Sequence, residues 1–260
     1  MNQAIDIVDK VLLFHDVNTT SRVGMQDLNS RYLMDWAKFK KIFEIGKNSE
    51  VIFEALNKQS NTHSSQKFTR ITIDDGGGSC LEIATFLKKQ NIKGYFFIVT
   101  DFIGRQNFLN ASEIRAIYKM GHVIGSHSHT HPHPFHLLTQ DQIKFELKKS
   151  KDLLEQLLNT SIKVFSVPGG EINKRTLRIL TDPFLDFDEI YISTPYKGKK
   201  NFRFNKKAKI YGRLCIEDGM DELKISKFIT GKGWVLALID YQIRRLKREI
   251  FYRLNLHSNF

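Results

Sequence analysis

Short apolar runs of strand length alternate along this chain with segments of helical periodicity, and no other feature limits the fold as much. The runs lie at residues 11–14, 68–73, 94–99, 123–124, 162–165, 189–193 and 210–216. The run at 94–99 is apolar throughout, as is typical of a strand that is buried on both faces. Strands that alternate with helices predict an α/β fold with a parallel sheet, either open or closed into a barrel.

The segments between these runs carry apolar residues at helical intervals. Helices are expected over residues 81–90, 112–120, 174–180 and 234–254. A further helix is expected after Thr139, because Thr139 and Gln142 have the spacing of a capping box and aliphatic residues follow at helical intervals. The chain has 260 residues, of which 41% are hydrophobic, which is enough for one sizeable core. We therefore expect a single domain over residues 1–260.

The sequence also bears on where the protein works. Cys80 and Cys215 are the only cysteines, too few for a disulfide framework, and both are expected to be buried or semi-buried free thiols. No apolar stretch reaches the roughly 18–20 residues of a membrane span. Residues 1–10 lack the basic and apolar regions of a signal peptide. These features together predict a cytoplasmic protein.

The charge is strongly basic, with a net charge of +12 and a pI near 9.6. Nucleic acid, an anionic membrane and an anionic substrate are the partner classes that such a charge suggests. Residues 234–255 form a basic amphipathic helix, which suits peripheral contact with an anionic membrane at its inner face. The alternative is a helix that packs on the fold and has a solvated basic side. Nucleic acid is not favoured, since no recognised binding motif accompanies the charge.

Polar residues follow the ends of several expected strands. They are His15, the pair Asp74-Asp75, His127 and the pair Pro168-Gly169. In parallel α/β folds, the carboxyl ends of the strands meet at one edge of the sheet, and that edge carries the site. We therefore expect these side chains to share one functional site.

The aspartate pair and the histidine cluster contain what a metal-dependent hydrolase requires. His127 and His131 are four residues apart, and with one carboxylate they supply three ligands, while the other carboxylate stays beside the metal as a base. Asp74 and Asp75 are not expected to point the same way, because successive side chains of a strand alternate. Imidazole ligands suit one divalent ion, zinc above all, with cobalt or nickel as alternatives. The competing interpretations are a simple Asp-Gly turn and a histidine-rich surface loop.

Two further features suit an amide hydrolase. His15 ends a strand, so a barrel would bring it to the same rim as Asp74, where an imidazole could protonate a leaving amine. Alternatively, a local backbone group satisfies His15. Residues 166–170 end another strand with flexible backbone, and the amide of Gly169 could donate to a developing oxyanion.

These motifs resemble those of the NodB-type polysaccharide deacetylases, carbohydrate esterase family 4. The first family motif, Thr-Phe-Asp-Asp-Gly, corresponds to residues 72–76, and the second, His-Ser/Thr-x-x-His-Pro, corresponds to residues 127–132. The resemblance covers roughly residues 11–216. It implies a distorted (β/α) barrel of about seven parallel strands and a metal-dependent hydrolase that removes N-acetyl groups from a carbohydrate. By the same match, Asp74 would be the general base, and Asp75, His127 and His131 would bind the metal.

The sequence departs from the family pattern in three places. The third motif, Arg-x-Pro-Gly, corresponds to residues 166–169, where serine replaces the arginine that would orient the base; Arg213 is a candidate substitute. The resemblance also suggests that Pro168, Gly170 and Arg213 contact the substrate. The last family motif is shifted to residues 11–17, as in the poly-N-acetylglucosamine deacetylase branch, which makes His15 the general acid. The aspartate and tryptophan of the fourth motif have no counterpart.

Two alternative functions are open at this point. The missing arginine and the unplaced fourth motif would suit a catalytically impaired relative that only binds sugar. The basic C-terminal helix would suit a deacetylase or deformylase of a lipid-linked sugar at a membrane surface.

Overall fold

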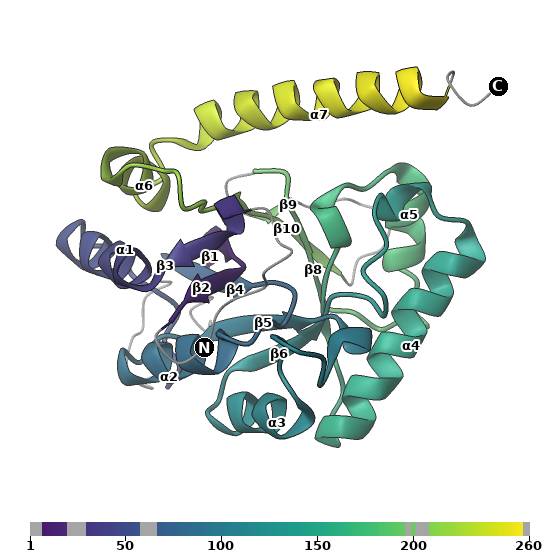
Figure 1. Ribbon diagram of the computed structural model, residues 1–260, viewed down its shortest axis with the longest axis horizontal. Coiled ribbons are helices and arrows are strands. Elements are labelled where there is room, and N and C mark those ends of the chain that lie inside the picture. The colour runs from purple at the N-terminus through teal and green to yellow at the C-terminus, as the bar shows by residue number, and fades with distance from the viewer. Residues whose placement is uncertain (1–6, 20–29, 58–66, 196–198, 201–207, 257–260) are drawn as a thin grey trace, which may run out of the picture.

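The computed structural model describes residues 7–19, 30–57, 67–195, 199–200 and 208–256, and Figure 1 shows how their elements are arranged. The strands of the main sheet are β1 (Ile7–Phe14), β4 (Lys67–Ile73), β5 (Gly94–Ile98), β6 (Val123–Ser126), β7 (Val164–Ser166), β8 (Glu189–Ile192), β9 (Lys199–Lys200), β10 (Lys209–Gly212) and β11 (Leu214–Cys215). A separate two-stranded sheet contains β2 (Asp16–Asn18) and β3 (Leu33–Asp35). Residues 57–66 are polar and without periodicity, which predicts a loop, and all of them but Asn57 lie outside the described residues.

The main sheet is a nearly closed parallel barrel. Its strand order is β11-β1-β4-β5-β6-β7-β8-β10-β9, and only the pairing of β10 with β9 is antiparallel. β10 pairs with β8 at one end of the row of parallel strands, and β11 pairs with β1 at the other end. Both ends are therefore formed by segments that are adjacent in sequence. A single residue, Arg213, separates β10 from β11. The seven expected strands and the barrel are confirmed, and the seventh strand is interrupted at Arg213.

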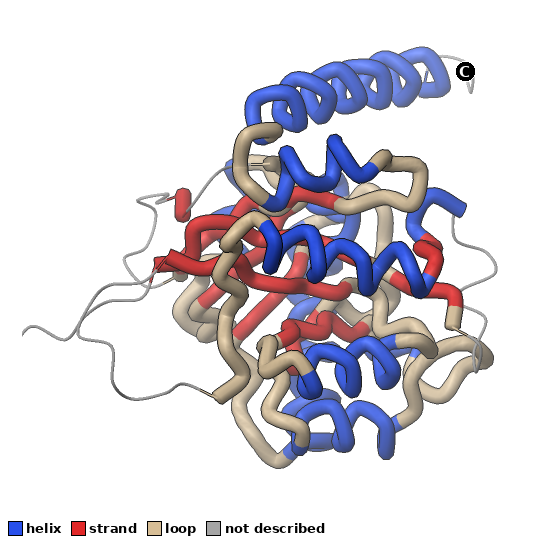
Figure 2. Tube along the Cα trace, turned by 90° about the vertical axis from the view of Figure 1, so that its left-hand side faces the viewer, coloured by secondary structure: helices blue, strands red, loops and turns tan. Residues whose placement is uncertain are grey.

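Helices surround the barrel, as Figures 1 and 2 show. They are α1 (Trp36–Asn48), α2 (Cys80–Lys89), α3 (Ala111–Lys119), α4 (Gln140–Leu158), α5 (Lys174–Leu180), α6 (Glu222–Ile229) and α7 (Trp234–Leu256). Five were expected from periodicity. The expectations did not include α1 and α6, although Asp35 and Asp221 cap their first turns by accepting backbone hydrogen bonds. The expected capping box of α4 is confirmed, since Thr139 and Gln142 exchange hydrogen bonds.

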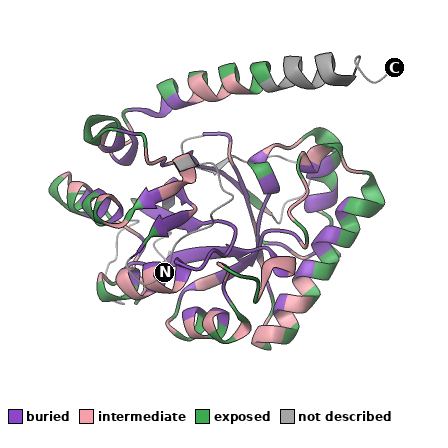
Figure 3. Cartoon of the chain, in the orientation of Figure 1, coloured by how far each residue is buried: buried purple, intermediate pink, exposed green. Residues whose placement is uncertain are grey.

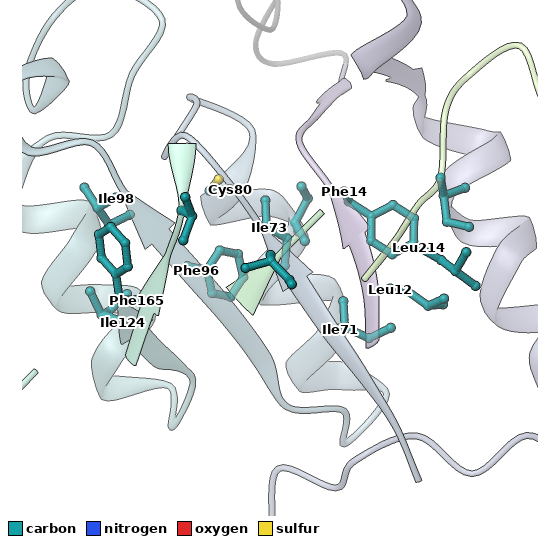
Figure 4. Close-up of a cluster of buried hydrophobic side chains, with 14 of the residues drawn as sticks. Leu12, Phe14, Ile71, Ile73, Cys80, Phe96, Ile98, Ile124, Phe165 and Leu214 are labelled. Atoms are coloured by element: carbon teal, nitrogen blue, oxygen red, sulfur yellow. The ribbon is translucent and has the colours of Figure 1, made fainter. Parts of the chain in front are cut away.

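The main hydrophobic core lies between the barrel wall and the helices. Figure 4 shows part of this core, in which Ile71, Ile73 and Phe96 cluster with other buried side chains. Cys80 is fully buried in this core and Cys215 is half-buried, and both are free thiols. Figure 3 shows the strands as mostly buried, and all five residues of β5 are buried as expected. No helix among the described residues is both long and apolar enough to cross a membrane.

The barrel interior holds a second, largely aromatic core. Tyr95, Phe97, Tyr191 and Tyr211 pack there with several valines. Arg70 lies over Tyr95 and pairs with Glu54 and Glu189, while Arg213 lies 5.9 Å from the Phe97 ring centroid. Alternate residues of a strand share one face, so Arg70, Thr72 and Asp74 lie in line along β4 and its carboxyl end. The aromatic layer therefore separates a structural ion cluster around Arg70 from the charged rim around Asp74.

Candidate functional site

The expected site residues come together at the carboxyl ends of the barrel strands. His15, Asp74, Asp75, His127, His131, Gly169 and Arg213 all line one cavity of about 390 Å³. Pro168 and Gly170, the other two residues expected to contact substrate, are buried beside Gly169 and do not line this cavity. The strand order places these seven residues on one rim, as the position of polar residues after strands predicted.

Three of these side chains form a group that could hold a metal ion. One ligand atom each from Asp75, His127 and His131 lies within 4.8 Å of the others. The Oδ1 atom of Asp75 is 3.4 Å from Nε2 of His127 and 3.6 Å from Nε2 of His131. Two ligands that each lie about 2.1 Å from a tetrahedral zinc ion are about 3.4 Å apart, so this spacing fits one divalent ion.

The backbone of β7 fixes the orientation of His127. Its Nδ1 lies 2.8 Å from the carbonyl oxygen of Ser166, which can only accept, so Nδ1 carries the proton. In the neutral ring Nε2 is then unprotonated and faces Asp75, as a metal ligand requires, whereas in the protonated ring Nε2 can donate to Asp75. Burial alone would lower the pKa of His127, but the carboxylates of Asp74 and Asp75 and the Ser166 carbonyl raise it above its usual value.

The other two ligands have shifted pKa values for related reasons. Burial and the neighbouring His127 lower the pKa of His131 to about 4, although Asp75 opposes this. Burial would raise the pKa of Asp75, but a hydrogen bond from His127 and the imidazoles around it hold that pKa well below the usual carboxyl range. Asp75 is thus ionised and His131 neutral at neutral pH, which are the states that bind a metal ion.

Both aspartates turn toward the same imidazole, which simple alternation along the strand did not predict. Asp74 Oδ2 lies 3.6 Å from His127 Nε2, close to the 3.4 Å of Asp75 Oδ1. β4 ends at Ile73, and Asp75 has a left-handed backbone with φ of 75°. Ser128 and His131 share this uncommon conformation. Backbone strain of this kind gathers at functional sites, where the surrounding fold maintains it.

Asp74 is held by a buried arginine, Arg213, which lies between β10 and β11. Arg213 Nη1 donates to Asp74 Oδ1 at 2.7 Å, and Nη2 donates to Asp74 Oδ2 at 2.8 Å. The Ser166 hydroxyl also donates to Asp74 at 3.0 Å and accepts from Arg213 at 2.9 Å. Ser166 occupies the position where the family motif has arginine. The guanidinium therefore reaches the expected base from the gap between β10 and β11.

This pairing determines the charge of Asp74. Burial would raise the pKa of Asp74, but the Arg213 guanidinium and then His127 outweigh burial and lower the pKa below its usual value. Asp74 is therefore a carboxylate at neutral pH and can accept a proton.

His15 enters the cavity from the end of β1. Its ring lies 4.4 Å from the ring of Tyr32, and its Nδ1 is buried with no hydrogen-bond partner among the described residues. The alternative, in which a local backbone group forms a hydrogen bond with His15, is therefore not supported at Nδ1. Burial lowers the pKa of His15, and the nearby Asp75 and Asp74 only partly oppose this shift.

The absence of a side chain at Gly169 allows His133 to approach the site. Its φ is 66°, and a Cβ atom built on it would lie 2.4 Å from Nδ1 of His133. Only glycine combines this backbone conformation with so close a neighbour. His133 lines the same cavity, although no sequence motif assigns it a role.

Several contributors to the site could not be found from the sequence. Glu146 of α4 accepts hydrogen bonds from the amides of His129 and Thr130, and so braces the loop that carries the histidine ligands. In sequence Glu146 is one more charged helix residue, so no local signal marks it. His122, which begins a strand and from sequence alone is interpreted as structural, is buried and bonds the backbone of Gly94 and Ala84.

Comparison with known proteins agrees with the site. Residues 61–183 match the family model described as polysaccharide deacetylase. The matched range contains both aspartates, the histidine ligands and Gly169, whereas His15 and Arg213 lie outside it. Over 170 residues, 65% of this chain, the sequence is 25% identical to a Bacillus subtilis (strain 168) protein named "Putative polysaccharide deacetylase YxkH". The matched region spans 59% of the length of that relative.

Solved structures share the fold at low sequence identity. The Streptococcus pyogenes deacetylase PplD, solved in complex with acetate, matches with a TM-score of 0.67 and 18% identity, covering 87% of this chain and 98% of that one. IcaB from Ammonifex degensii matches with a TM-score of 0.63 and 17% identity, covering 91% of this chain and 100% of that one. Identities this low support the barrel fold, and the case for activity depends on the geometry of the site.

Proposed function

We propose that this chain, which carries a polysaccharide deacetylase domain over residues 61–183, is a metal-dependent hydrolase that removes N-acetyl groups from an amino sugar or glycan. We further propose that residues 1–260 act as one domain, since the barrel closes only where β11 pairs with β1. The observation that carries the proposal is the position of an ionised, arginine-held carboxylate directly beside a three-residue metal group.

Asp75, His127 and His131 would hold the metal. Their spacing, their burial and the tautomer that Ser166 imposes on His127 all suit a divalent cation, and imidazole ligands favour zinc, with cobalt or nickel as alternatives. When bound, such an ion supplies Lewis-acid activation of a water molecule and of the amide carbonyl.

The protein's own groups then move the protons. Asp74 accepts the proton of the attacking water, and Arg213 keeps its carboxylate ionised and oriented. His15 is the proposed donor of a proton to the departing amine of the sugar; burial disfavours the protonated ring that this role needs, whereas the neighbouring carboxylates of Asp75 and Asp74 favour it. The amide of Gly169, on a backbone that only glycine adopts easily, is the proposed donor to the oxyanion. The products are acetate and a sugar with a free amine.

The non-catalytic alternative loses its main argument at Arg213. Its two bases were the unplaced fourth motif and the absence of the arginine that orients the base in the third motif. In this structure a guanidinium contacts both oxygens of Asp74, although it comes from the break between β10 and β11. We therefore favour the hydrolase over a protein that only binds sugar.

The test is the variant Asp74→Asn, which removes the base and keeps the size of the side chain. We expect acetate release from N-acetylglucosamine oligomers to fall by about 10²–10⁴-fold while the metal content stays as in the wild type. Asp101→Asn is the matched control, because this aspartate is on the surface and pairs with Arg105. Full activity in Asp74→Asn would refute the role of the base, and absence of metal from the wild type would refute metal dependence.

A further inference from the structure

The C-terminal helix α7 forms one wall of the cavity that contains the proposed active site. Figures 1 and 2 show α7 lying across one side of the molecule, next to α6. Ala237, Asp240, Tyr241 and Arg244 recur at helical intervals and line the same cavity as the metal group. Arg244 pairs with Glu217, which also lines the cavity. The face of α7 that points inward is therefore partly charged.

The opposite face of α7 is aliphatic and exposed. Its residues Val235, Leu236, Ile239, Ile243 and Leu246 are 70%, 63%, 51%, 50% and 59% exposed, respectively. At 3.6 residues per turn these five fall on one stripe, on the side away from Ala237 and Tyr241. An ordinary surface helix buries its apolar stripe and exposes its charges. The arrangement in α7 is the reverse, so its outer stripe, defined by these five residues, calls for an apolar partner.

The charges of α7 identify the kind of partner. The sequence of the helix contains five Lys or Arg residues and two acidic residues. Arg245 and Lys247 border the outer stripe on its two sides and are exposed, and the whole chain carries a net charge of +12. Two copies of α7 paired through this stripe would bring these like charges together, whereas helix pairs normally place opposite charges there. An anionic lipid surface offers both an apolar layer and negative headgroups.

We propose that α7 is an interfacial helix whose outer stripe lies on an anionic lipid surface. The cavity then lies about one helix diameter, roughly 10–12 Å, from that surface. With the cavity at this distance, the expected substrates are amino sugars presented at a membrane, for example on a lipid carrier. This statement about the substrate rests on the proposed deacetylase function. The membrane contact itself does not depend on the chemistry of the site.

The test is flotation of the full-length chain with two kinds of vesicle. One kind is phosphatidylcholine alone, and the other is phosphatidylcholine mixed with phosphatidylglycerol. The wild type should float with the anionic vesicles and much less with the neutral ones. The triple variant Leu236→Ser, Ile239→Ser, Ile243→Ser should lose about tenfold or more of this binding, since the buried apolar area sets the affinity. Because these side chains are exposed and do not line the cavity, acetate release from soluble oligomers should stay unchanged.

A matched control removes the same number of exposed apolar side chains elsewhere. Ile52→Ser, Phe145→Ser, Phe184→Ser acts on residues that are 46%, 57% and 78% exposed, and it should float like the wild type. The double variant Arg245→Glu, Lys247→Glu should lose binding to anionic vesicles. Failure of the wild type to float, equal losses in the control, or a wild-type dimer that the triple variant dissociates would each overturn the membrane proposal.

Activity measurements separate this inference from the proposed function. With an N-acetylated glycolipid in the vesicles, the triple variant should deacetylate several-fold more slowly than the wild type, while both act equally on soluble oligomers. Equal rates on the glycolipid would overturn the substrate class. A chain that floats but releases no acetate from any N-acetyl sugar would overturn the hydrolase and leave the membrane contact standing.

Discussion

Arg213 and Asp74 form a bidentate ion pair at the carboxyl-end rim of the barrel, and their side chains are 0% and 4% exposed. Arg213 lies at the one-residue break between β10 and β11, where the sheet closes. Closure of the barrel and placement of the proposed base therefore depend on the same residue. A buried ion pair of this kind is weak evidence for stability, but it defines the charge and orientation of the carboxylate.

The first prediction concerns this pair. Arg213→Lys keeps the positive charge but cannot make two parallel hydrogen bonds to one carboxylate, so Asp74 loses its fixed orientation. We expect kcat for acetate release to fall by about tenfold or more, with metal content unchanged. The control is Arg105→Lys, whose partner Asp101 is on the surface. Wild-type kcat in Arg213→Lys would show that the pair has no positioning role.

The second prediction concerns the metal group. His127→Ala and His131→Ala should each lose most of the bound metal, because a site with two remaining protein ligands binds a divalent ion far less tightly. His129→Ala is the matched control from the same loop, since His129 bonds Thr100 rather than the metal group. Elemental analysis of the purified variants measures the effect. Equal metal content in the His127 and His129 variants would contradict the assignment.

The third prediction concerns His15 as the acid. An amine must be protonated as it leaves, whereas a nitrophenolate leaves without a proton. His15→Gln should therefore lower amide hydrolysis by about 10²-fold or more and the hydrolysis of 4-nitrophenyl acetate much less. The comparison is made with Asp74→Asn, which should impair both reactions because both need the base. Equal losses on the two substrates in His15→Gln would rule out the acid role.

The fourth prediction concerns stability and pH. Burial lowers the pKa of His122 below its usual 6.5, and its ring bonds Gly94 and Ala84 in the neutral form. The unfolded chain takes up the proton near pH 6.5 but the folded one only at lower pH. This contribution to the free energy of unfolding is therefore complete above about pH 6.5 and is lost as the pH falls toward the folded pKa.

Urea unfolding of the wild type and of His122→Gln at a series of pH values below about 7 measures this effect. The difference in stability between the two proteins should shrink as the pH falls. At neutral pH the variant should be less stable by about 1–3 kcal/mol, because a buried hydrogen-bonded ring is lost. A difference that stays constant with pH would mean that His122 does not titrate on unfolding.

Much of the fold follows from local sequence signals. Apolar runs such as 94–99 and the capping box at Thr139 predicted strands and helices that the structure confirms. A parallel sheet brings the carboxyl ends of its strands to one rim, so the grouping of Asp75, His127 and His131 also followed from the order of motifs along the chain. These features are decided by side-chain periodicity and by residues close together in sequence.

Other features depend on contacts between residues far apart in sequence. The break at Arg213, which lets one run of chain complete both edges of the barrel, has no local signature. The left-handed turn at Asp75, which overrides the alternation of the strand, is maintained by its surroundings. Glu146 likewise gains its role only where α4 passes the histidine loop.

The sequence by itself determined the inventory of this protein: the alternating strands and helices, the chemistry of the aspartates and histidines, and a basic amphipathic C-terminal helix. Only the tertiary structure decided that Arg213 holds Asp74 and that α7 turns its charged face inward and its aliphatic face outward. The physical reason is that periodicity and motif spacing act within one segment. The partner of a buried charge and the exposed side of a helix are set by which distant segments pack against it.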